Sequence, residues 1–149
     1  MASDAQLDLV RFTVALAGET DFAGWRDAAR RLALAGVRPE DIGWRVGNEL
    51  PSTVLPVLDP GVVLKVTKEF VERAETVFCH ADPERFAFLY RLLWRLKSEP
   101  HLLSIASDPD IRRFEAMAKA VRRDIHKMRA FLRFREVAVE DGLRFVAWF

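Results

Sequence analysis

The residues with the clearest chemical potential are cations that recur along one stretch of the chain. They follow one another at steps of three and four residues: Arg122, His126, Arg129 and Arg133. Such steps place side chains on one face of an α-helix. Like charges at this spacing repel each other by a few tenths of a kcal/mol per pair unless a partner neutralises them. This row is therefore suited to contact the phosphates of a nucleic-acid backbone, which releases condensed counterions.

Further cations lie beside this row, and together they form the candidate interface. Arg91 and Arg95 would extend the surface if they face outward. The sequence has no helix-turn-helix, zinc-finger or RNA-binding motif, so contact with the backbone is expected rather than base readout. The candidate nucleic-acid contacts are Arg122, His126, Lys127, Arg129, Arg133 and Arg135.

His126 is open to three interpretations: a phosphate contact, a general acid or base, or a surface histidine. An acid–base role would require a neighbouring carboxylate such as Asp124, Glu115 or Glu136. Complete catalytic motifs are absent from the sequence, which has no glycine-rich phosphate loop, HExxH pair or GxSxG elbow. No catalytic residue is therefore assigned beyond the weak candidate His126, and the chain alone is expected not to be an enzyme.

The element that must position these cations is a long helix over residues 108–134. Asp108-Pro109-Asp110 is a start signal, because aspartate caps free N–H groups and proline fits the first turn. Apolar residues recur at steps of three and four, which predicts a seam packed along the whole helix. The seam consists of Ile111, Phe114, Ala118, Val121, Ile125, Met128 and Leu132.

The first half of the chain reads as a small sheet with helices. Strands are predicted at Leu7–Ala17, Ile42–Val46 and Val62–Val66, from their apolar content and alternation. Helices are predicted from a cap at Thr20 or Asp21 through Leu34, and over Lys68–Phe78. Residues 1–66 would form a strand–helix–strand lobe, followed by a helical core with a hairpin over residues 67–149.

In that second part, Asp82-Pro83-Glu84 starts a helix to about Lys97 that is apolar almost all round and so belongs in a core. A shorter helix should follow Pro100 and run through Ser107. The chain then reads as a β-hairpin, Phe131–Val139 and Leu143–Phe149, around an Asp-Gly turn. Both faces of the last strand are apolar, so we expect a domain cut short after Phe149, or a strand paired outside this chain. The predicted fold is one α+β domain.

Charge is unevenly distributed although the net charge is only +1. Residues 1–83 carry 9 Lys/Arg against 13 Asp/Glu, whereas residues 84–135 carry 13 against 6. A basic block in a near-neutral protein suits a partner rich in phosphates or carboxylates, and a solvated arginine-rich face is the competing interpretation. Cys79 is expected to be a buried, inert thiol. No membrane span or signal peptide is recognised, so the expected location is the cytoplasm.

The strings RFAFLYRLLWRL (85–96), EAMAKAVRRDIHKMRAFLRFREV (115–137) and RFVAWF (144–149) resemble a domain of unknown function found in bacterial DNA-repair proteins. The string at residues 20–46 also resembles the start of those proteins. The resemblance implies a place N-terminal to a family-4-like uracil-DNA glycosylase, which carries an iron–sulfur cluster. The glycosylase motifs and cluster cysteines are missing here, so no cofactor is expected in this chain. A glycosylase domain, in cis or in trans, is the implied partner.

Three hypotheses follow. The chain is an accessory domain of a uracil-DNA glycosylase system that binds DNA through its basic helix. Alternatively it is a protein–protein docking module that pairs through its open last strand. The third hypothesis, a His126-dependent enzyme acting on an anionic substrate, ranks last.

Overall fold

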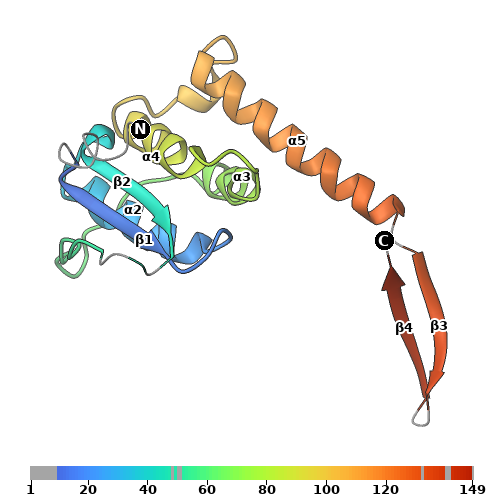
Figure 1. Ribbon diagram of the computed structural model, residues 1–149. Coiled ribbons are helices and arrows are strands. Elements are labelled where there is room, and N and C mark those ends of the chain that lie inside the picture. Colours follow the sequence, from blue (N-terminus) through green and yellow to red (C-terminus); the bar gives the residue numbers. More distant parts are fainter. Residues whose placement is uncertain (1–9, 48, 50–51, 132, 140–141, 149) are drawn as a thin grey trace, which may run out of the picture.

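The computed structural model describes residues 10–47, 49, 52–131, 133–139 and 142–148, with the backbone alone beyond Ala130. A compact α+β body is followed by a long helix that runs out of it and by two paired strands (Figure 1). The elements in chain order are β1 (Phe12–Leu16), α2 (Phe22–Leu34), the 3₁₀ turn η1 (Pro39–Asp41), β2 (Ile42–Val46), α3 (Lys68–Phe78), α4 (Arg85–Ser98), the 3₁₀ turn η2 (Leu102–Ser104), α5 (Pro109–Phe131), β3 (Arg133–Val139) and β4 (Gly142–Trp148).

Strands β1 and β2 pair in parallel, in a register that runs from Phe12↔Ile42 to Leu16↔Val46. Two parallel strands need a crossover between them, and α2 provides it. Helix α2 starts where the sequence predicts, because the Asp21 carboxylate accepts a hydrogen bond from the backbone N–H of Gly24. The prediction of a small N-terminal sheet with helices is confirmed.

The third strand predicted at Val62–Val66 does not form, and that expectation is wrong. The outer edge of β1 is already occupied by the segment that follows β2. The backbone N–H of Thr13 donates to Thr53 Oγ1 and that of Ala15 donates to Ser52 Oγ, each at 2.9 Å. Residues 62–66 are therefore left as an irregular stretch.

Helix α4 occupies the middle of the core, as its apolar surface predicts. The Tyr90 hydroxyl donates to the backbone carbonyl of Val37 at 2.6 Å, and burial raises the pKa of that hydroxyl. The Trp25 indole N–H donates to the carbonyl of Phe86 at 3.1 Å. These bonds join α4 to the first half of the chain. The helix predicted after Pro100 is shorter than expected, since only the turn η2 forms there.

Arg85, at the start of α4, is only 4% exposed, which the sequence did not reveal. Its guanidinium donates to the backbone carbonyls of Phe78, Asp82 and Glu19 and to the Glu19 carboxylate. It also lies over the Phe86 ring, 4.1 Å from the centroid. A buried cation is tolerable only when its donors are satisfied in this way.

Helix α5 packs on α3 through only part of its length. The Phe70 and Phe114 rings stack with their centroids 5.9 Å apart. Because α3 has 11 residues and α5 has 23, at 1.5 Å per residue α5 is about twice as long as its partner. The seam is buried from Ile111 to Val121, whereas Ile125 is 42% and Met128 is 57% exposed.

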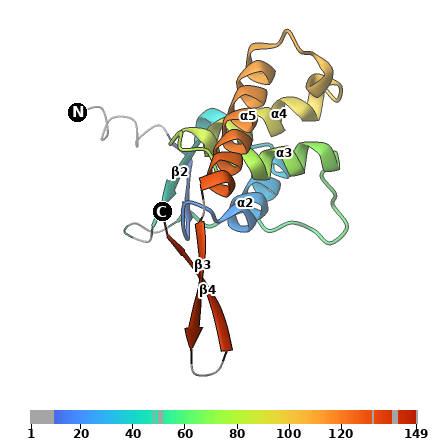
Figure 2. The same ribbon diagram turned by 90° about the vertical axis from the view of Figure 1, so that its right-hand side faces the viewer.

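The expectation of a seam packed along the whole of α5 is therefore wrong, and its last member, Leu132, lies outside the described residues. The residues of α5 from Arg122 onward, here called the distal segment, run away from the body in Figure 1, and Figure 2 views the helix from the side toward which it points. Beyond it, β3 and β4 pair antiparallel, with Arg133 opposite Trp148. They form a sheet separate from that of β1 and β2. The expected turn residues Glu140 and Asp141, and Phe149, lie outside the described residues.

Two isoleucines of the same seam provide a matched test of this division. We expect Ile111→Ala to lower the free energy of unfolding by about 3 kcal/mol, because it empties a filled position in the core. Ile125→Ala should change it by less than about 0.5 kcal/mol, because that side chain packs against little. Urea denaturation followed by circular dichroism measures both. Equal losses in the two variants would show that the distal segment packs on the body in solution.

Candidate nucleic-acid interface

One of the two arginines at the start of α5, Arg113, is engaged within the fold. The Arg113 guanidinium lies 3.0 Å from the Asp82 carboxylate and 4.3 Å from the centroid of the Phe88 ring. Glu115 accepts a hydrogen bond from Arg73 of α3. Two charged side chains in the first turns of α5, Arg113 and Glu115, therefore contact neighbouring elements rather than solvent alone.

Arg91 and Arg95 were candidate extensions of the basic surface, and the structure places both in ion pairs with the start of α5. Arg91 contacts Asp110 at 2.6 Å. Arg95 contacts Asp108 at 2.7 Å, Asp110 at 3.1 Å and Glu99 at 2.9 Å. The Arg95 hydrogen bonds lower the pKa of the Asp108 carboxyl to about 2, and the same bonds raise the pKa of Arg95. Their charge is thus largely neutralised inside the molecule.

The cations of the distal segment are in a different situation. All residues from Arg122 to Ala130 are exposed. Within the described side chains, the one ion pair here joins Arg123 to Asp124, at 3.9 Å. Four Lys/Arg side chains therefore stand against a single carboxylate, with His126 among them. The structure thus divides the basic block into cations that are paired within the fold, such as Arg91, Arg95 and Arg113, and exposed cations without an acidic partner among the described side chains, which are Arg112, Lys119 and most cations of the distal segment.

Helical geometry sorts the distal side chains into two faces. Viewed down the helix axis, at 100° per residue, the basic side chains occupy an arc of about 160°. Arg129 and Lys127 lie at its two ends, and Arg122, His126 and Arg123 lie between them. Ile125 and Met128 lie on the opposite side, continuous with the buried seam. The arrangement can present a row of cations to a polyanion while the apolar side faces away.

His126 is exposed on this basic face. Among the described side chains it makes no hydrogen bond or ion pair, so neither Asp124 nor Glu115 orients it. The side chain of Glu136, the third carboxylate considered, lies outside the described set. His126 therefore does not form an acid–base pair with either Asp124 or Glu115.

Arg133 and Arg135, the remaining predicted contacts, belong to β3. Residues two apart share one face of a strand, so the two positions lie on the same side of the β3–β4 ribbon. Their side chains lie outside the described set. The structure therefore brings Arg122, His126, Lys127 and Arg129 together on one helix, and it places the other two at the start of the strand that follows.

Residues 83–149 match the family model of a domain of unknown function, DUF4130. No curated protein and no solved structure matches the chain. The matched segment begins two residues before α4 and contains every candidate contact on α5 and β3.

No group of three or more His, Cys, Asp or Glu side chains in the described part of the chain is placed to hold a metal ion. None of the helices found there is long and apolar enough to cross a membrane. Cys79 is exposed at the end of α3, so the expectation of a buried thiol is wrong. The chain has one cysteine, whereas iron–sulfur clusters are held by several.

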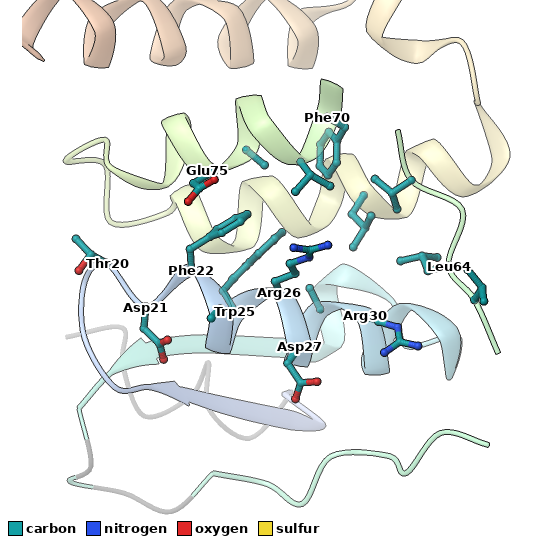
Figure 3. Close-up of a pocket in the computed structure, with 17 residues that line it drawn as sticks. Thr20, Asp21, Phe22, Trp25, Arg26, Asp27, Arg30, Leu64, Phe70 and Glu75 are labelled. Atoms are coloured by element: carbon teal, nitrogen blue, oxygen red, sulfur yellow. The ribbon is translucent and has the colours of Figure 1, made fainter. Parts of the chain in front are cut away.

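Sequence reasoning missed one further feature, a groove of about 900 Å³ between α2, α3 and residues 63–66 (Figure 3). Arg26 and Glu75 are among its charged residues. No local sequence pattern predicts the groove, because its walls come from three separate segments of the chain. The only hint was the apolar run Val62–Val66, which the sequence assigned to the sheet.

The ion pairs at the start of α5 should make stability depend on pH. A lowered aspartate pKa contributes stability that is complete above the unfolded value, near 3.8, and is lost as pH falls through about 2. We expect Asp108→Asn to remove that part of the pH dependence between about pH 4 and pH 2. Thermal unfolding of both proteins across this range measures it.

Asp82 serves as the internal reference in that comparison. Its pKa is also lowered, by the backbone N–H of Glu84 and by Arg113, and it is present in both proteins. Parallel pH profiles for the parent and Asp108→Asn would contradict the role given to the Arg95–Asp108 pair.

Proposed function

We propose that the chain is an accessory domain of a uracil-DNA glycosylase system and that the distal segment of α5 binds the nucleic-acid backbone. The observation that carries the binding proposal is the exposed, uncompensated row of cations from Arg122 to Arg129. The association with a glycosylase is supported by the sequence resemblance described above.

Electrostatics favours the distal segment over the basic residues that are paired within the fold. Arg113 has an acidic partner within the fold, and so do Arg91 and Arg95 of α4, so a phosphate would have to compete with a carboxylate for them. Arg122, Lys127 and Arg129 have no such partner among the described side chains, so each neutralised phosphate adds counterion release without breaking an ion pair. The distal segment also projects from the body, so the body does not obstruct its approach to a polyanion (Figure 1).

A matched pair of double variants tests the interface. Arg122→Gln/Arg129→Gln and Arg112→Gln/Lys119→Gln each remove two exposed cations seven residues apart on α5. Fluorescence anisotropy with labelled single- and double-stranded DNA, titrated at several salt concentrations, measures binding. We expect the distal variant to bind about tenfold more weakly. The slope of log K against log salt should become less negative by about 1.8 for duplex DNA and by about 1.4 for single strands, the values for two lost phosphate contacts.

The proximal variant is the control and should retain most of the affinity. Equal losses in the two variants would show that binding follows net charge rather than the distal segment. Parent-like binding by the distal variant would place the interface elsewhere.

A second candidate function, docking of a protein partner through the last strand, has one observation in its favour. In the described chain β4 pairs with β3 alone, so its other edge carries no strand. An open edge can accept an extended segment of another protein. Association through backbone pairing would be insensitive to salt, whereas DNA binding weakens steeply with it. Size-exclusion chromatography of the chain at two salt concentrations separates the two behaviours.

A further inference from the structure

The groove between α2, α3 and residues 63–66 has the dimensions and lining of a small-molecule site. Its volume of about 900 Å³ lies within the range usual for ligand pockets. Apolar side chains line its interior, among them Phe22, Trp25, Phe70 and Leu93. Trp25, Phe70 and Leu93 are only 2–5% exposed, so among these four side chains the half-buried Phe22 presents the ring surface that a ligand can reach.

The third wall exists because residues 62–66 did not join the sheet. Leu64 and Val66 pack against the core, while Val63 is 71% exposed. Arg30 of α2 donates to the carbonyl of Val62 at 3.1 Å, which ties this segment across the helix. The groove is therefore held open by specific contacts on both sides.

Most of the charged groups around the groove already have partners. The two oxygens of Asp21 accept hydrogen bonds from the backbone N–H groups of Gly24 and Ala17. Asp27 pairs with Arg31 at 3.1 Å. Arg30 is held by Val62, as described.

Arg26 and Glu75 are different. Among the described residues neither side chain makes a hydrogen bond or an ion pair, although both line the groove. Figure 3 shows Arg26 on α2 beside Trp25, in the middle of the groove, and Glu75 on α3 near Phe22, toward one end. An unpaired guanidinium and an unpaired carboxylate thus both line an apolar groove.

This layout specifies a class of ligand. The guanidinium fits a phosphate or a carboxylate, which it can hold through two parallel hydrogen bonds. The Phe22 ring can stack on a flat ring, and the Glu75 carboxylate fits an N–H donor. We propose that the groove binds a small anion with a flat, N–H-bearing ring, the chemistry of a mononucleotide. This site is independent of the proposed DNA interface, because α3 lies between it and α5 (Figure 3).

The test uses the full chain and probes that separate the parts of the ligand. ¹⁵N-labelled protein is titrated with AMP, CMP, GMP and UMP, and also with adenosine, which lacks the anion, and ribose 5-phosphate, which lacks the ring. The indole N–H of Trp25 is buried against Phe86 at the groove floor, so its NMR signal reports occupancy. We expect at least one mononucleotide to shift this signal together with α2 and α3 resonances, and ribose 5-phosphate to bind far more weakly.

Two variants assign the charges. Arg26→Gln should weaken mononucleotide binding about tenfold, the factor for one charge-assisted hydrogen bond, while leaving adenosine binding unchanged. Its melting temperature should match that of the parent, because the side chain is exposed. Arg122→Gln/Arg129→Gln should leave mononucleotide binding at the groove intact, which separates this site from the α5 interface.

Three results would overturn the proposal: no shift at Trp25 with any mononucleotide, shifts confined to α5, or equal affinity of the parent and Arg26→Gln for the mononucleotide.

Discussion

The buried guanidinium of Arg85 joins the two parts of the chain, and the remaining arrangement depends on it. Three backbone carbonyls and one carboxylate accept its hydrogen bonds, from the loop before α2, the end of α3 and the turn before α4. Hydrogen bonds to a charged group contribute about 1.5–3 kcal/mol each, and an unsatisfied buried carbonyl is costly. Arg85 lies within the segment matched to DUF4130, whereas Glu19 and Phe78 lie before it. The matched segment is thus built into a larger unit.

Local signals in the sequence predicted the elements well. The bounds of α3 and β2 and the cap of α2 follow from apolar spacing and from Asp21, which act within a few residues. The predictions failed where a distant residue decided the outcome. The strand at Val62–Val66 was displaced by hydroxyls of Ser52 and Thr53 on the edge of β1. The periodicity of the seam identifies the apolar face of α5, but it contains no information on the length of α3, the helix on which that face packs.

The same distinction applies to the candidate sites. Spacing predicts that Arg122, His126 and Arg129 share a helix face, and they do. It cannot predict that Arg95 and Arg113 are neutralised, because Asp108 and Asp82 approach them only in the folded chain. The groove is harder still to anticipate, since it requires three segments and the failure of one of them to become a strand. The sequence gives the number of charged side chains, whereas the tertiary structure determines which of them are left without a partner and can bind a ligand.

The projection of α5 has a consequence for the helix itself. From Arg122 onward it has little packing to support it, and isolated helical segments of fewer than about 12–15 residues are marginal in water. Its order is then governed by a local helix–coil equilibrium rather than by the cooperative unfolding of the body. A polyanion that binds only the helical form shifts that equilibrium toward the helix. Part of the binding free energy therefore offsets the entropy lost when the distal segment becomes ordered. Affinity thereby becomes sensitive to helix propensity at positions that touch no ligand, with Met128 on the opposite face as an example.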